Sequence, residues 1–334
     1  MKFSGIGGQA VMEGVMMRNK EDYAVAVRKP DGEMAVVKGI YKGIIPQEIS
    51  GKIPILRGIV GFVDSLVLGM KALNYSADFY AEEPVEGKND KGSEGKAEEE
   101  KKDAVVTMAP EERNKSNALL TTVVMIIAVF LAMGLFMVIP YYTSLLFSRW
   151  IESNRILALI EGIIRLAVFV IYIKSISAME DIKRVFRYHG AEHKCINCLE
   201  SGKELTLENV RASSREHKRC GTSFLLYVMV VSILIFAFID FKSRLIRAAS
   251  RILLIPLIAG ISYEFIRLAG RSNNPFILAL SAPGLMMQRL TTAEPDDEMI
   301  KVGMASVEAV FDWKEFLKEN FGVSSGSEEK DLSE

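Results

Sequence analysis

Long apolar runs separated by charged segments dominate the pattern of this chain and predict an α-helical polytopic integral membrane protein. Residues 118–139 form an uninterrupted apolar run of about the 20 residues that a helix needs to cross a bilayer. Residues 156–173 and 222–239 have the same character. A fourth run, at residues 252–268, is interrupted by a proline and a glutamate. The pattern therefore predicts about four transmembrane helices.

Outside these runs, changes in composition divide the chain into further regions. Residues 82–117 mix charges with glycine and contain almost no aromatic residues, so this segment cannot bury enough surface to offset its ordering entropy. We divide the chain into a glycine-rich and β-hairpin region at 1–50, an amphipathic helix at 51–81, a disordered charged linker at 82–117, a membrane domain at 118–290 with a metal-site loop at 182–221, and a soluble acidic C-terminal tail at 291–334.

The N-terminal region predicts a small β element. Tyr23 and Val27 lie in a run that alternates with small or polar residues, and Pro-Asp-Gly at residues 30–32 supplies a turn before a second β-favouring run. The earlier stretch GIGGQAVMEGVMMR lacks the lysine of a phosphate loop and follows no predicted strand. We interpret it as a turn-rich segment packed close to another element, with Glu13 and Arg18 as its candidates for chemistry.

Two further segments have apolar faces without the pattern of a span. Residues 53–73 carry three charged residues seven positions apart, which places the charges close to one face and favours an interfacial or packed amphipathic helix. The run that begins at Pro275 is short and contains a Pro-Gly pair, so we expect it to be re-entrant or interfacial.

Charge indicates the orientation of the chain and one class of partner that it lacks. The formal net charge of -1 argues against a nucleic-acid partner, which would normally need a basic face. Most basic loop residues lie between the second and third apolar runs, whereas the preceding loop offers Arg149 and Arg155. The positive-inside rule then places both termini and the 182–221 loop in the cytoplasm, although the basic residues between 242 and 251 oppose this orientation.

All the histidines and cysteines of the chain lie in that loop. His189 and His193, in the sequence YHGAEHK, are four residues apart, so on a helix both could bind one metal ion, with Glu192 beside them. H-x-x-E-H is the inverted zinc-protease pattern, in which the glutamate acts as general base. His217 and Cys220 follow as H-x-x-C, and three histidines with one open position would form a catalytic site for zinc or another divalent transition metal.

Two other interpretations of the same loop remain open. Cys195 and Cys198 form C-x-x-C and, with His217 and Cys220, have the spacing of a closed structural zinc knuckle. A short amphipathic loop at a membrane surface can also carry histidines for hydrogen bonding alone.

Four separated motifs, GGQAVMEGVMMR, YHGAEHK, HKRCGTSF and EPDDEMI, resemble the YqhQ-like family, a group of bacterial membrane proteins described as predicted metal-dependent enzymes. The resemblance covers most of residues 1–315 and fails in the charged linker and the extreme tail. It implies a multi-pass protein of the bacterial inner membrane. The recurring positions of the family match His189, Glu192, His193, Cys198, Glu200, His217 and Cys220.

This chain departs from the family at Cys195, where a threonine or a similar residue is common. If the family's site works without that thiol, the C-x-x-C pair is incidental. The resemblance therefore favours His189, His193 and His217 as ligands, with Cys220 or Glu200 nearby. Glu13 would approach the metal if the N-terminal region folds over the loop.

The leading hypothesis is a membrane-bound, zinc-dependent hydrolase-like enzyme with Glu192 as general base. Its substrate would lie at the membrane surface and would be a peptide, a membrane protein or a lipid-linked group. A membrane scaffold or assembly factor with a structural zinc site is the first alternative. A small transporter that uses Glu161 and Glu264 is the second, since ionisable residues within a bilayer usually face a bundle interior or a wet cavity.

Overall fold

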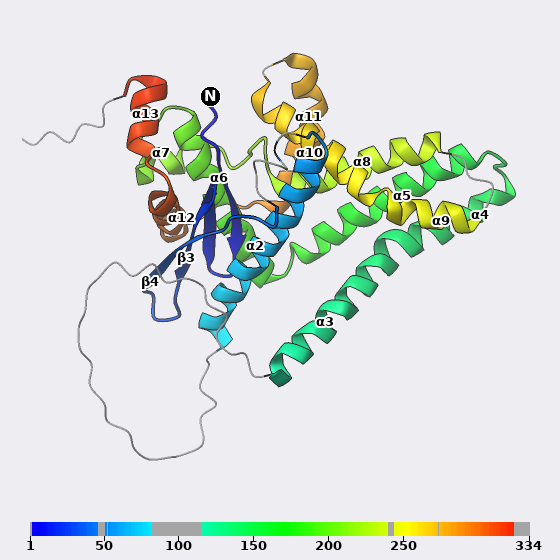
Figure 1. Ribbon diagram of the computed structural model, residues 1–334, viewed down its shortest axis with the longest axis horizontal. Helices are drawn as coiled ribbons and strands as arrows, with labels where there is room; N and C mark the ends of the chain where they lie inside the picture. Colours follow the sequence, from blue (N-terminus) through cyan, green and yellow to red (C-terminus); the bar gives the residue numbers. More distant parts are fainter. Residues whose placement is uncertain are drawn as a thin grey trace, which may run out of the picture.

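The computed structural model of the chain describes residues 2–45, 51, 53–81, 115–239, 244–272 and 274–323. It has a layered α/β body on one side and long helices that extend away from it on the other (Figure 1). The body contains a four-stranded antiparallel sheet in the order β1-β2-β3-β4. Its strands are β1 (Ile6–Val11), β2 (Gly14–Asn19), β3 (Asp22–Arg28) and β4 (Met34–Ile40).

The sheet contains the predicted hairpin and a second hairpin that we did not predict. β3 and β4 pair on either side of the Pro-Asp-Gly turn, as expected. The glycine-rich opening is not turn-rich, because it forms β1 and β2, joined by a tight turn in which Glu13 has a φ of 50°. Its glycines concealed the strand alternation, in which Val11, Val15 and Met17 are fully buried.

Helices cover both faces of the sheet and create two cores. α2 (Leu56–Ala81) lies on one face, where its Leu68 and Ala72 pack with Val11 and Val25 of the strands. α6 (Glu180–Glu200) and α12 (Asp297–Val310) lie on the other face. The core on that side includes Tyr188, Ile196, Leu199, Met299, Ile300 and Val307.

The region predicted to be a soluble acidic tail contributes to the core of the α/β body. α12 contacts β2, β3 and α6, and it begins at Asp296, whose side chain caps the helix by accepting from the Met299 amide. The short helix α13 (Trp313–Phe321) follows. The acidic residues conceal an apolar stripe on α12, which is why composition suggested a solvated segment. Residues 324–334 lie outside the described part of the chain.

Three helices in the described residues are long and apolar enough to cross a membrane: residues 126–149, 154–176 and 221–238. The first comprises the end of α3 (Lys115–Met133), the π-helical turn Gly134–Val138, α4 (Ile139–Leu146) and the 3₁₀ turn Phe147–Arg149. The other two are α5 (Asn154–Ile176) and α8 (Gly221–Phe238), which pack together. The chain is therefore a helical membrane protein with an N-terminal sheet.

The fourth predicted span is divided between two shorter helices. α9 (Arg244–Leu253) ends before Pro256, and α10 (Ile255–Arg271) packs on α2 and α8. α11 (Pro275–Thr291) is continuous through Pro283, so the expectation that the Pro-Gly pair breaks this segment is wrong. Gly284 instead lets α11 approach α8, because a Cβ there would lie 2.3 Å from the Tyr227 hydroxyl.

The predicted disordered linker lies largely outside the described chain. Residues 82–114 are not described, and the last residues of the predicted linker, 115–117, already belong to α3.

Charged residues of the long helices form pairs between elements. Glu161 of α5 accepts from Arg165 at 2.6 Å and also pairs with Arg251 of α9 at 2.5 Å. Glu264 of α10 pairs with Arg57 of α2. Each carboxylate therefore ties two helices together.

Candidate metal centre

The histidine pair lies on a buried helix, α6, rather than on a surface loop. From Gly190 to Glu200 every residue of α6 is buried between the sheet and α12. Gly190, which weakens a helix in isolation, is required here because a Cβ would lie 2.1 Å from the carbonyl oxygen of Ala293. The expectation of a His/Cys loop was wrong for this part, since the polar residues of α6 face a buried site and not water.

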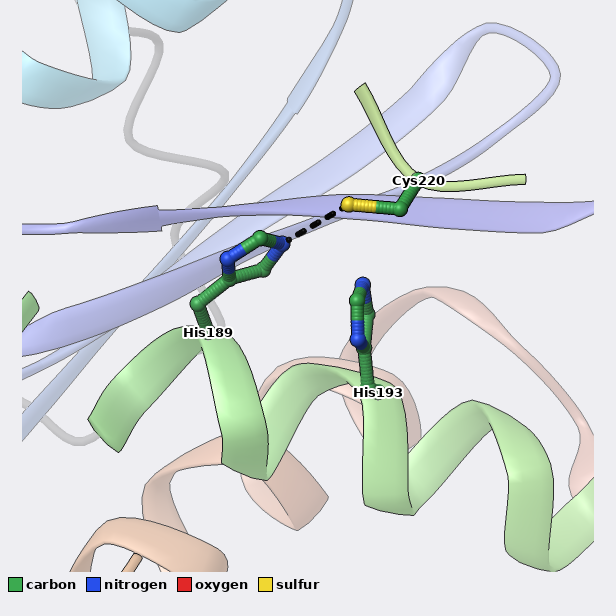
Figure 2. A group of neighbouring side chains, drawn as sticks. All are labelled: His189, His193 and Cys220. Carbon is green, nitrogen blue, oxygen red and sulfur yellow. Dashed lines mark hydrogen bonds between the residues drawn. The ribbon is translucent and has the colours of Figure 1, made fainter. Parts of the chain in front are cut away.

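Three predicted ligands converge at one point. His189, His193 and Cys220 each offer a donor atom, and these atoms lie within 4.8 Å of one another. Figure 2 shows the two imidazoles rising from α6 toward the thiol, which comes from the segment before α8. The Nε2 atom of His189 is 3.2 Å from the Sγ atom of Cys220. Within the described residues, this is the one group of three or more such side chains placed to share a metal ion.

Backbone carbonyls orient both imidazoles. The Nδ1 atom of His189 is 2.9 Å from the Thr291 carbonyl oxygen, and that of His193 is 2.6 Å from the Arg215 carbonyl oxygen. A carbonyl accepts only, so each Nδ1 must carry the proton. The Nε2 atoms of neutral rings then present lone pairs to the cluster. Second-sphere carbonyls commonly fix ligand histidines in this way.

Cys220 favours the thiolate form. Its side chain caps α8 by accepting from the Thr222 amide. Burial by itself would raise the pKa of Cys220, but the charges of His189 and His193 and their hydrogen bonds lower it well below its usual range. Burial likewise opposes a charged His189, yet the thiolate raises the pKa of this imidazole to about 9. The cluster therefore favours negative sulfur, the form that binds metals.

Glu192 lies against the same cluster. Its Oε2 atom is 3.8 Å from the Nε2 atoms of both His189 and His193, and the side chain is only 5% exposed. The backbone of β1 covers it, because a Cβ on Gly8 would lie 2.7 Å from the Glu192 Cγ atom. The carboxylate is thus held beside the ligands in a site with little water.

His217 lies one ring further away. Its ring centroid is 5.6 Å from that of His193, and its Nε2 atom is 3.6 Å from the Oε2 atom of Glu200. Glu200 also pairs with Arg219 at 2.6 Å and accepts from Ser4. Burial favours a protonated Glu200, but His217 and Arg219 lower its pKa to about 2. Glu200 and Arg219 thus form an ion pair beside His217, and both Glu200 and His217 lie outside the compact ligand group.

The C-x-x-C pair lies in the core of the α/β body. Cys195 and Cys198 are fully buried free thiols, and Cys198 approaches the carbonyl oxygen of Glu204 at 3.3 Å. Burial raises the pKa of Cys195 well above its usual value and that of Cys198 to about 11. Because neither joins the ligand group of Cys220, the four-ligand knuckle is not assembled in the described residues.

The sheet folds over α6, but Glu13 does not reach the ligand group. It pairs with Arg28 at 2.8 Å and with Arg184 of α6, and it accepts from the Tyr188 hydroxyl. It therefore fastens the β1–β2 turn to α6 one helical turn before His189. Arg18, the other N-terminal candidate, donates to the Lys20 carbonyl and stacks on Tyr41.

Sequence reasoning missed the groups that support the ligands. Gln288 of α11 accepts from the His217 amide at 2.7 Å and donates to the His217 carbonyl and to Ser223. It joins the segment before Cys220 to the helix that ends at Thr291. The only sequence signal for Gln288 was a glutamine late in an apolar run. The backbone carbonyls that orient the imidazoles have no sequence signal.

Fold and site together define a helical membrane protein with a His/Cys centre between its α/β body and its long helices. The chain belongs to the family described as "Protein of unknown function (DUF1385)", whose model matches residues 53–313. It is 35% identical over 301 residues to "Uncharacterized protein YqhQ" of Bacillus subtilis (strain 168), covering 90% of each chain. No solved structure matches the chain. Membership of the YqhQ-like family, expected from the four motifs, is confirmed.

Proposed function

We propose that this protein is a membrane-bound, metal-dependent hydrolase-like enzyme that acts at the membrane surface. The convergence of His189, His193 and Cys220 carries the proposal. The donor atoms of two imidazoles and one thiolate lie within 4.8 Å of one another, and the thiolate carries a negative charge in a buried position. A divalent cation bound by all three donors would take the place of the imidazole proton as the partner of that sulfur.

Zinc fits this donor set best. Imidazole nitrogen and thiolate sulfur are its preferred ligands, and three protein ligands leave one position open, as in catalytic zinc sites. His217, which we expected as a third imidazole ligand, faces Glu200 instead, so Cys220 takes its place in the proposal. A divalent metal here would polarise a substrate carbonyl and acidify a water molecule.

Glu192 is the proposed general base. Its carboxylate lies 3.8 Å from both ligand Nε2 atoms and therefore borders the position where a reacting water would lie. The carboxylate would accept a proton from that water and deliver it to the leaving group. The buried setting excludes bulk water, which strengthens the interaction of Glu192 with the reacting groups.

The position of the site supports a substrate at the membrane surface. Cys220 directly precedes α8, a membrane-length helix, and Thr291 ends α11, which packs along α8. We place the α/β body on the cytoplasmic side of the bacterial inner membrane, because its α5–α8 connection holds most of the basic loop residues.

Packing within the α/β body also supports four crossings. β1–β4, α6 and α12 form one core, so all three must lie on the same side of the bilayer. The segments between them must then cross an even number of times. Residues 115–176 supply two crossings, whereas α8 supplies only one, so we assign the return to α9 and α10 together.

Metal content tests the proposal. Detergent-purified protein, prepared without chelators, should contain about one zinc per chain by elemental mass spectrometry. His193→Ala should lose the metal, whereas the matched variant Cys198→Ala, which removes a buried thiol outside the group, should retain it. Metal-free wild-type protein would overturn the proposal.

The role of Glu192 separates the enzyme from a structural alternative. The site also ties α6, α8 and α11 together, which is what a scaffold with a structural zinc would need. Glu192→Gln is expected to keep the metal and the fold but to abolish complementation of a deletion strain. Full complementation by the metal-loaded variant would favour the scaffold.

A further inference from the structure

The edge of the sheet that lies beside the proposed centre has unpaired backbone groups. β1 is an edge strand, since it pairs with β2 alone. In Figure 1, β3 and β4 lie on the side of the sheet away from the long helices, so β1 is the edge nearer to them. An unpaired edge strand is a template for pairing with another extended chain.

The register identifies which groups are free. Val11 pairs with Gly14 across the two-residue turn, and such a pair exchanges both hydrogen bonds. The alternation then directs the N–H and C=O groups of Gln9 and Gly7 to β2, and those of Gly8 and Ala10 to the open edge. Among the described residues, no side chain or backbone group outside the sheet bonds to Gly8 or Ala10.

These free groups adjoin the catalytic base. A Cβ at Gly8 would meet the Cγ atom of Glu192 at 2.7 Å, so the residue that carries free N–H and C=O groups packs directly against the Glu192 side chain. Along this strand Gly7 is exposed and Gly8, Gln9 and Ala10 are half-buried, so the edge of β1 is accessible although Glu192, His193 and Cys220 are buried.

From these observations we infer that the open edge of β1 binds an extended peptide, which pairs with Gly8 and Ala10 and presents a peptide bond to Glu192. The inference rests on the proposed function and specifies its substrate as a polypeptide rather than a lipid-linked group. Main-chain pairing of this kind gives affinity with little dependence on sequence. A lipid head group has no such row of alternating donors and acceptors to offer.

The reaction that follows is peptide hydrolysis, which is balanced without a further reactant. One water is consumed, its oxygen bonds to the peptide carbonyl carbon, and the C–N bond breaks. Glu192 takes the proton of the water and passes it to the leaving nitrogen. The products are a carboxylate and an amine, and nothing is oxidised or reduced.

Proline substitution provides a selective test. Ala10→Pro removes one free N–H and places a ring on the open edge, whereas no bond to β2 is lost, and proline is tolerated on edge strands. The matched control is Val36→Pro in β4. The alternation from the β3–β4 turn directs the Val36 N–H to the opposite edge of the sheet, and its side chain is 43% exposed.

The probe is a pool of short soluble peptides, blocked at both ends and randomised at their central positions. Full-length wild-type protein, first stripped of metal to prevent cleavage, is equilibrated with the pool, and bound peptides are identified by mass spectrometry. We expect individual peptides to bind Ala10→Pro about tenfold more weakly, as the loss of one or two hydrogen bonds implies, and Val36→Pro unchanged. Equal binding of every peptide to all three proteins would overturn the inference.

Hydrogen exchange in the wild-type protein provides a second test that does not depend on whether the variant folds. The Gly8 and Ala10 amides should exchange fast alone and more slowly with an enriched peptide, whereas Val36 and Lys38 of β4 should not change. Protection absent at Gly8 and Ala10 would also overturn the inference. Neither readout needs metal, so peptide binding by a protein that never takes up zinc would refute the proposed function and leave the peptide site standing.

Discussion

Individual residues in this protein matter mainly through the neighbours that constrain them. His189 and His193 become suitable ligands because two backbone carbonyls fix their tautomers. Gly8 matters because any side chain there would displace Glu192. The pattern H-x-x-E-H did predict a shared helix face and the presence of Glu192 beside it. It could not reveal that His217 faces Glu200, since spacing alone does not distinguish a ligand from its neighbour.

Glu200 should make stability depend on pH in the acid range. Its pKa is lowered to about 2 in the folded protein from an ordinary value of 4.5. A depressed folded pKa contributes stability that is fully present above the unfolded pKa, so this contribution is lost as pH falls from about 4.5 toward about 2. It amounts to about 3 kcal/mol at neutral pH. Thermal unfolding in detergent across this range measures it.

Glu200→Gln supplies the comparison. The variant keeps the size of the side chain but cannot ionise, so its stability at neutral pH should be lower than that of the wild type. Between about pH 5 and about pH 3 its stability should also vary less than that of the wild type. Parallel pH profiles for the two proteins would show that the ion pair with Arg219 adds nothing to folding.

At the scale of elements, hydropathy was informative for the membrane helices and misleading for the α/β body. Membrane spans are apolar on all sides, so composition alone reveals α5 and α8. The strands and helices of the α/β body each have one buried face, and the polar residues on the other face make this amphipathic pattern hard to recognise in the sequence. The glycines of β1 and the acidic residues of α12 obscured the buried positions of these elements, and the histidines and charged residues of α6 made it resemble a surface segment.

The close approach of α6 at Gly190 to the connection between α11 and α12 is testable. Gly190→Ala should destabilise the protein by about 1–3 kcal/mol, despite alanine's higher helix propensity, because its Cβ would overlap the Ala293 carbonyl. Gly134→Ala, where an added Cβ meets nothing within 4 Å, is the control and should not lower the melting temperature. Equal melting temperatures for both variants would contradict the close approach.

At the scale of the whole molecule, the α/β body is assembled from three separate parts of the chain. The strands precede the first long helix, α6 lies between the second and third, and α12 follows the last helix of the membrane region. Sequence analysis could identify these parts but not join them, because contacts between distant segments leave no local periodicity. The hydropathy pattern therefore predicted the spans without predicting the body that they carry.

The proposed orientation predicts opposite labelling of two exposed sites. Glu152→Cys lies between α4 and α5, and Lys318→Cys lies in α13, while the native thiols are all buried. A membrane-impermeant maleimide added to intact spheroplasts should label the cysteine at 152 but reach that at 318 only after permeabilisation. Labelling of both positions from the outside would refute the proposal that all parts of the α/β body lie on the cytoplasmic side. It would also refute the number of crossings that depends on this proposal.

The division of the α/β body along the chain also determines when the centre can form during synthesis. The ribosome makes β1 first and His189 midway, but Thr291, which orients His189, and α12, which completes the core, are made near the end. No intermediate nascent chain contains a finished site. Any activity therefore begins only after Thr291 and α12 have been made, so a nascent chain released before them would be inert.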